Sequence, residues 1–223
     1  MHTVTKKLEF SMLSVNHLIL LGDSIFDNAA YVANGPTVIQ QVNSQLPGNW
    51  HATLLAVDGD TSADVEKQLT RLPLDATHIV LSVGGNDALG CISMLEASVS
   101  SVKQGLTALT QIQKEFEVTY QGMISKLVAL GKPLLLCTVY DQVPGLPPEL
   151  RTALGLFNDV ILRDAVRLEL PVLDLRMVCT EPDDYSEKSP IEPSSKGGEK
   201  MATRLVDAVL GHDFTKRSCK VYK

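Results

Sequence analysis

Short apolar runs alternate along the chain with longer segments in which apolar residues recur every three or four positions. The runs are continuous rather than alternating in polarity, as in parallel strands that are covered on both faces. They span residues 18–21, 52–57, 78–83, 133–139 and 171–175. Segments with helical spacing follow four of them, over residues 36–46, 61–72, 148–168 and 194–210. This order predicts one α/β domain built from five βα units, with a parallel sheet between two layers of helices.

The longest connection, residues 99–130, also carries an apolar stripe at helical spacing. Such a stripe indicates core packing rather than a cofactor site. We expect Gly105 and Gly122 to break or bend this helix, because glycine is unfavourable in a helix interior. The polar segment 180–193 has three prolines and predicts a long loop. The predicted organisation is an extension over 1–14, the domain over 15–212 and a tail over 213–223.

The amino-acid composition argues against nucleic acids and membranes as binding partners. The 223 residues have a formal net charge of −6, so no basic surface is expected for nucleic acid or anionic membranes. The amino terminus lacks the apolar core of a signal peptide, and no apolar run is long enough to cross a bilayer. The four cysteines are scattered, which favours free thiols. These features predict a cytoplasmic protein without membrane or nucleic-acid partners; the oligomeric state is not readable.

Three glycine-containing motifs follow the first three apolar runs. They are Gly22-Asp23-Ser24, Asp58-Gly59-Asp60-Thr61 and Gly84-Gly85-Asn86-Asp87. Each motif alone is typical of a tight turn or a helix cap. Because the carboxyl ends of parallel strands meet at one edge of a sheet, we expect the three motifs to lie together, where α/β proteins bind ligands.

These residue types suit acyl transfer. The Ser24 hydroxyl would attack a carbonyl carbon. The backbone N–H groups of Ser24 and Gly59 and the side-chain amide of Asn86 would then surround the developing oxyanion, where each donor typically contributes a few kcal/mol. Asp23 and Asp87 are candidate supporting residues in the same motifs.

The motifs resemble those of the SGNH hydrolase family, also called GDSL esterases and lipases. Gly22-Asp23-Ser24-Ile25 is similar to the first block, which contains the nucleophile. Gly59 and Asn86 match the oxyanion positions of the second and third blocks, and residues 191–202 resemble the fifth block. The resemblance implies a flavodoxin-like three-layer α/β/α sandwich with a five-stranded parallel sheet. It also implies hydrolysis of a small ester or other acyl substrate without a metal or cofactor.

The fifth block departs from the family pattern, which has Asp-x-x-His before a proline. Here Ser189 and Glu192 occupy the aspartate and histidine positions, and Pro193 follows. The five histidines of the chain do not replace the missing base. Three begin predicted strands at the opposite edge of the sheet, one follows the last helix and one lies in the extension; they are His17, His51, His78, His212 and His2.

Two interpretations of Glu192 stay open. It is the base of a Ser24–Glu192 dyad, with a pKa raised by burial, or it is structural, capping the last helix or pairing with Arg176 or Lys196. The second interpretation predicts a catalytically silent binding protein. A third predicts a metal-dependent hydrolase, because several carboxylates are expected at this edge and such groups bind Mg²⁺. They are Asp23, Asp27, Asp58, Asp60, Asp87, Asp141 and Glu192.

Overall fold

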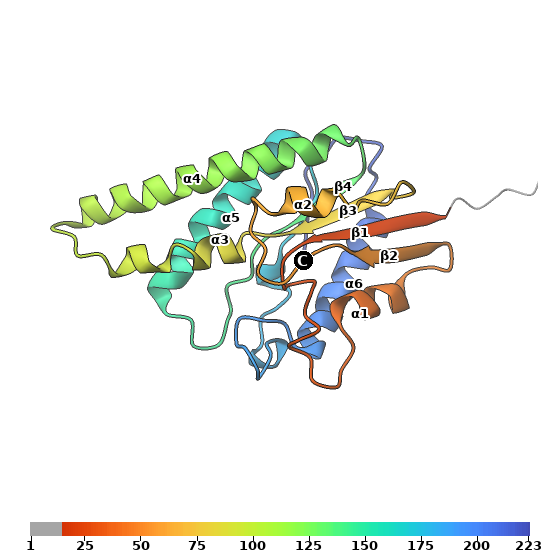
Figure 1. The fold of residues 1–223 in the computed structure, drawn as a ribbon, viewed down its shortest axis with the longest axis horizontal. Coiled ribbons are helices and arrows are strands. Elements are labelled where there is room, and N and C mark those ends of the chain that lie inside the picture. The colour runs from red at the N-terminus through yellow and green to blue at the C-terminus, as the bar shows by residue number, and fades with distance from the viewer. Residues whose placement is uncertain (1–14) are drawn as a thin grey trace, which may run out of the picture.

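Parallel strands form one sheet in the computed structural model, which describes residues 15–223 (Figure 1). From edge to edge, the order within this part of the chain is β2-β1-β3-β4-β5-β6. The strands are β1 (Asn16–Gly22), β2 (Trp50–Leu54), β3 (His78–Ser82), β4 (Leu134–Cys137), β5 (Val172–Leu173) and β6 (Val221–Tyr222). Each predicted apolar run overlaps one of the first five strands, which confirms the parallel α/β arrangement.

The expected number of strands was five, and the sheet among the described residues has six. The additional strand, β6, comes from the segment that the sequence predicts as a tail. The Val172 and Asp174 N–H groups donate to the carbonyls of Lys220 and Tyr222, at 2.9 and 2.8 Å. Strand β6 has only two residues and lies between Lys220 and Lys223, so the sequence shows no apolar run there. The pairing instead satisfies backbone groups at the open edge of β5.

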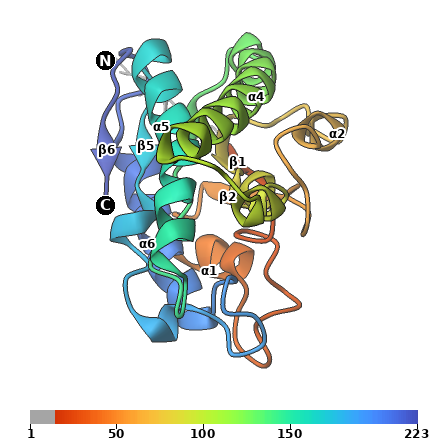
Figure 2. The same cartoon turned by 90° about the vertical axis from the view of Figure 1, so that its left-hand side faces the viewer.

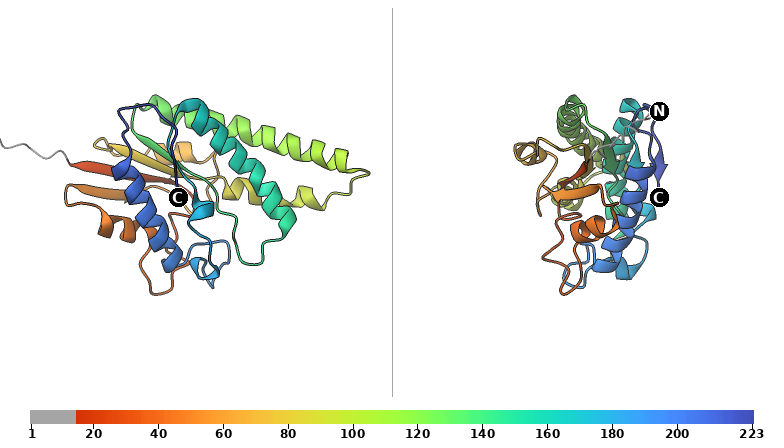
Figure 3. Two further views of the ribbon diagram at one scale, coloured as in Figure 1. Left: turned by 180° about the vertical axis from the view of Figure 1, so that it is seen from behind. Right: turned by 90° about the vertical axis from the view of Figure 1, so that its right-hand side faces the viewer.

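The sheet is covered on both faces, as Figures 2 and 3 show from several sides. Leu18 and Leu20 of β1 pack in the core on one face, and Ile19 and Leu21 pack in the core on the other. Helices α1 and α6 complete the first core, and α4 and α5 complete the second. The principal helices are α1 (Val38–Gln45), α4 (Val102–Ala129), α5 (Pro148–Leu168) and α6 (Ser195–Gly211).

Helix α4 is continuous through Gly105 and Gly122, so the expected break does not occur. Each glycine costs a helix about 1 kcal/mol. Burial of Phe116, Ile124 and Leu127 in the core outweighs that cost. None of the helices within residues 15–223 is both long and apolar enough to cross a membrane.

Short helices at the carboxyl edge of the sheet were harder to predict. Helix α2 (Val65–Leu69) is shorter than the expected 61–72. Between β3 and α4 lie α3 (Gly85–Leu89) and the 3-10 helix η1 (Ile92–Glu96), which the apolar pattern does not reveal. Two further 3-10 helices, η2 (Leu175–Met177) and η3 (Pro182–Asp184), precede α6.

Candidate active site

The first motif begins at Gly22, which ends β1 and pairs with Ser82 of β3. Gly22 has φ +130°, and a Cβ at this position would lie 1.7 Å from the Ser82 carbonyl oxygen. The buried Gln68 amide accepts from the Gly22 N–H at 2.9 Å and donates to its carbonyl at 2.6 Å. Asp23 N–H donates to the Ser82 carbonyl at 3.2 Å. These contacts end the strand and place Ser24 at the carboxyl edge of the sheet.

Ser24 and Glu192 meet there although 168 positions separate them in the sequence. The Ser24 hydroxyl donates to Glu192 Oε1 at 3.1 Å. Both residues are 6% exposed. Glu192 Oε2 is buried without a hydrogen-bond partner among the described residues. The glutamate therefore presents one carboxylate oxygen to the hydroxyl that the sequence predicts as the nucleophile.

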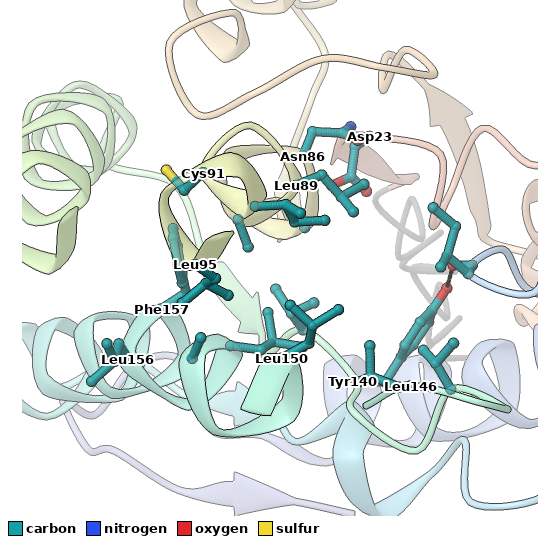
Figure 4. Close-up of a pocket in the computed structure, with 18 of the residues that line it drawn as sticks. Asp23, Asn86, Leu89, Cys91, Leu95, Tyr140, Leu146, Leu150, Leu156 and Phe157 are labelled. Carbon is teal, nitrogen blue, oxygen red and sulfur yellow. Dashed lines mark hydrogen bonds between the residues drawn. The ribbon is translucent and has the colours of Figure 1, made fainter. Parts of the chain in front are cut away.

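The loop that carries Glu192 is held on both sides of this residue. The Ser186 N–H donates to the Glu192 carbonyl at 2.8 Å, and the Glu192 N–H donates to the Ser189 carbonyl at 3.0 Å. The Tyr140 hydroxyl, which is drawn in Figure 4, donates to the Ile191 carbonyl at 2.6 Å. Together these bonds fix the backbone on either side of the carboxylate.

Asn28 connects this loop to the first motif. Its side chain is fully buried, donates to the Pro193 carbonyl at 3.3 Å and accepts from the Val38 N–H at 3.0 Å. Asn28, Tyr140 and Gln68 were missed by sequence reasoning, because their spacing follows no motif. The only sequence signal for Asn28 is its place just beyond the first motif.

The structural roles considered for Glu192 are occupied by other residues. Ser194 is the N-cap of α6, and its hydroxyl accepts from a backbone N–H of the first turn. Arg176 and Lys196 pair with other carboxylates, at 2.6 and 2.9 Å. Glu192 thus neither caps the last helix nor pairs with either cation.

Burial shifts the pKa values of both carboxyl groups beside Ser24. Burial raises the pKa of Glu192 to about 7, against the opposing effect of the hydrogen bond from Ser24. Burial also raises the pKa of Asp23 to about 8, where the N–H of Ile25 opposes the shift and the nearby Glu192 adds to it. Near neutral pH, Glu192 is therefore divided between its ionised and protonated forms, while Asp23 is mostly protonated.

The second and third motifs are joined to each other at the same edge. Asn86 Nδ2 donates to the Asp60 carbonyl at 2.9 Å. Asp87 accepts from the N–H and the hydroxyl of Ser62, at 3.0 and 3.1 Å. An amide nitrogen has two N–H groups, so this one bond engages only half of the Asn86 donor capacity. Gly59 lies in an exposed turn with φ +85°.

A pocket of about 900 Å³, its open mouth included, extends from the Ser24–Glu192 pair. Ser24, Glu192, Asp23 and Asn86 form its polar end, whereas Gly59 is not part of the lining. The remaining wall is almost entirely apolar (Figure 4). It comes from α3, η1, α4 and α5, from the segment 139–146 that precedes α5, and from Ile25 and Ile191. Examples of these apolar side chains are Leu89, Leu95, Leu150, Leu154 and Phe157.

The carboxylates at this edge do not gather into a metal-binding group within residues 15–223. Several instead accept hydrogen bonds from neighbouring residues. Asp27 accepts from the Asp58 N–H at 3.1 Å, Asp58 accepts from the Tyr31 hydroxyl at 2.8 Å, and Asp60 accepts from the Gln68 amide at 2.8 Å. The donor set expected for a metal-dependent hydrolase is therefore not assembled.

Sequence comparison identifies the family of the chain. Residues 20–200 match the GDSL-like lipase/acylhydrolase family. The chain belongs to this family. It is accordingly an acyl hydrolase, an enzyme that cleaves ester bonds. No curated protein sequence matches the chain.

Solved structures of lipases and esterases share the fold of this acyl hydrolase. A lipase from a goat rumen metagenome has 19% identity and a TM-score of 0.68, covering 86% of this chain and 97% of its own. An acetyl xylan esterase has 20% identity and a TM-score of 0.65, covering 86% and 99%. A lipase/acylhydrolase from Enterococcus faecalis has 20% identity and a TM-score of 0.61, covering 88% and 96%. At these identities the similarity establishes the fold, and the expected three-layer α/β/α class is confirmed.

Proposed function

We propose that this acyl hydrolase cleaves small esters with an apolar acyl chain through a Ser24–Glu192 dyad. The observation that carries the proposal is the buried hydrogen bond from Ser24 to Glu192, 3.1 Å long, at the end of an apolar pocket. A general base works best when its pKa lies near the operating pH. Burial raises the pKa of Glu192 to about 7, which supports glutamate in the position where the family has histidine.

In the proposed reaction, ionised Glu192 takes the Ser24 proton as the serine oxygen forms a bond to the substrate carbonyl carbon. The carbonyl oxygen becomes an oxyanion, for which the Ser24 N–H and the Asn86 amide are candidate donors. Glu192 then returns the proton to the leaving alcohol as the ester bond breaks. Water repeats the sequence on the acyl-enzyme, which releases the acid and restores Ser24.

The volume and apolar lining of the pocket support recognition of an acyl chain of several carbons. Each methylene group buried there contributes about 0.8 kcal/mol, or roughly fourfold in kcat/KM. We expect kcat/KM for p-nitrophenyl esters to rise from acetate to longer chains until the pocket is filled. A polar acyl group would gain nothing from the walls formed by α3, η1 and α5.

Three variants test the dyad on these esters. Ser24→Ala removes the nucleophile and should abolish both turnover and labelling by a fluorophosphonate. Glu192→Gln removes the base and should lower kcat by about 10²–10⁴-fold. Glu187→Gln, an exposed glutamate of the same loop, is the matched control and should retain full activity. Full activity in Ser24→Ala would refute the nucleophile assignment, and full activity in Glu192→Gln alone would refute the base.

A further inference from the structure

Two histidines lie side by side at the edge of the sheet opposite to Ser24. His17 of β1 and His51 of β2 are register partners, so their side chains leave the same face of the sheet. Their rings are stacked, with centroids 4.0 Å apart and an angle of 27° between the planes. Asp75, from the loop that leads into β3, reaches the same point. The candidate active site uses none of these residues.

The three side chains bring metal-ligand atoms close together. His17 Nδ1 lies 3.0 Å from Asp75 Oδ1. One ligand atom from each of His17, His51 and Asp75 lies within 4.8 Å of the other two. At metal–ligand distances of about 2.0–2.2 Å, tetrahedral ligands are roughly 3.3 Å apart. Because a metal ion lies in the plane of each imidazole that binds it, the solvent-accessible His51 ring must turn out of the stack to complete the geometry. The exposed Asp75 side chain must move with it.

His17 has the surroundings of a metal ligand. Its side chain is 6% exposed, so the ring has little freedom to turn. Its Nε2 atom lies 2.8 Å from the Thr53 hydroxyl, which leaves Nδ1 facing Asp75. A second hydrogen bond of this kind usually orients a metal-bound imidazole. The Asp75 side chain is 71% exposed, which gives an ion and a coordinated water access from solvent.

We propose that His17, His51 and Asp75 bind a divalent transition-metal ion such as Zn²⁺, with water as the fourth ligand. Two imidazoles and one carboxylate suit Zn²⁺, Ni²⁺ or Cu²⁺, whereas Mg²⁺ and Ca²⁺ prefer oxygen ligands alone. The site lies about 20 Å from Ser24, given roughly 3.3 Å per residue along β1. The ion is therefore structural: it links β1, β2 and the loop before β3.

Binding of Zn²⁺ alone to the full-length, tag-free, chelator-treated protein tests this site. We expect calorimetry to show one saturable site, a melting temperature that rises with Zn²⁺, and no response to Mg²⁺. His51→Ala and Asp75→Asn should each weaken binding by at least about tenfold, as should Thr53→Val through loss of the orienting bond. His51 and Asp75 are accessible to solvent, so their replacement leaves no cavity in the core and both variants should fold.

His78→Gln is the matched control for these variants. His78 begins β3 at the same edge, but its ring packs against Trp50 and Phe214 instead of the stacked pair. This variant should bind Zn²⁺ with unchanged affinity. Absence of a saturable site would overturn the proposal, as would unchanged affinity in both His51→Ala and Asp75→Asn. Cobalt substitution adds a separate check, since a thiolate-to-metal absorption band would assign the ion to cysteine instead.

Discussion

Replacement of Glu192 by glutamine should make the protein more stable at alkaline pH, relative to its stability at acidic pH, while it lowers kcat. Glutamine keeps the shape of the side chain and a carbonyl oxygen that accepts the hydrogen bond from Ser24, but it cannot ionise. In the native protein, burial raises the pKa of Glu192 from 4.5 to about 7. Ionisation of this glutamate is therefore harder in the folded protein than in the unfolded chain.

The magnitude follows from the linkage between proton binding and folding. Between pH 4.5 and 7 the folded protein binds more protons at Glu192 than the unfolded chain does, so the free energy of unfolding falls as pH rises. At about 1.4 kcal/mol per pH unit, the full difference is about 3 kcal/mol. Glutamine removes this loss. We expect the variant to gain about 2–3 kcal/mol over the native protein between pH 5 and pH 8.5.

Urea unfolding of both proteins at pH 5 and pH 8.5 measures the effect. Any pH-independent cost of the substitution, such as a buried amide nitrogen without a partner, cancels in the difference between the two pH values. Glu187→Gln, on the exposed surface of the same loop, should give the same difference from the native protein at both pH values. An equal effect of Glu192→Gln at pH 5 and pH 8.5 would show that Glu192 ionises normally, which would refute its role as a base tuned by burial.

Four further perturbations have defined outcomes. Gly22→Ala places a Cβ 1.7 Å from the Ser82 carbonyl and should lower the free energy of unfolding by more than about 4 kcal/mol, measured by denaturant unfolding; a stable variant would contradict the close approach of β1 to β3 at this residue. Asn28→Ala leaves two buried backbone groups unpaired, the Pro193 carbonyl and the Val38 N–H, and should lower the free energy of unfolding by about 2–4 kcal/mol. It should also lower kcat, because the Glu192 loop loses its anchor; unchanged kcat would exclude a positioning role. The kcat/KM of the native protein should rise with pH through about 7, as Glu192 ionises, and fall above about 8, as Asp23 ionises beside the developing oxyanion; Asp23→Asn should abolish the alkaline fall, and a profile that keeps it would assign that limb elsewhere. Ala153→Trp fills the apolar pocket and should lower kcat/KM for octanoyl esters by at least about tenfold relative to acetate; equal losses for both esters would place the acyl chain outside the pocket.

Local patterns predicted the parts of the fold that depend on burial and on backbone geometry. Continuous apolar runs revealed β1 and β3 because both faces of each strand are buried. The predicted bounds of α5 agree with the structure, since proline at its start is a strong local signal. Strand β6 and the short helix α3 escaped prediction. Strand β6 forms only by pairing with β5, which is distant in sequence. Helix α3 has five residues, too few to show helical periodicity.

The sequence by itself determined the α/β class and the position of Ser24 at the carboxyl edge. Three glycine-containing motifs each follow an apolar run, and the carboxyl ends of parallel strands meet at one edge of a sheet. It also predicted that Glu192 stands where the family pattern that the motifs resemble has histidine. Only the tertiary structure decided that Glu192 contacts Ser24 instead of capping α6 or pairing with a cation. Spacing along a chain cannot encode a contact across 168 residues or the burial that raises the pKa of a carboxyl group. Both arise when separate elements exclude water from the same place.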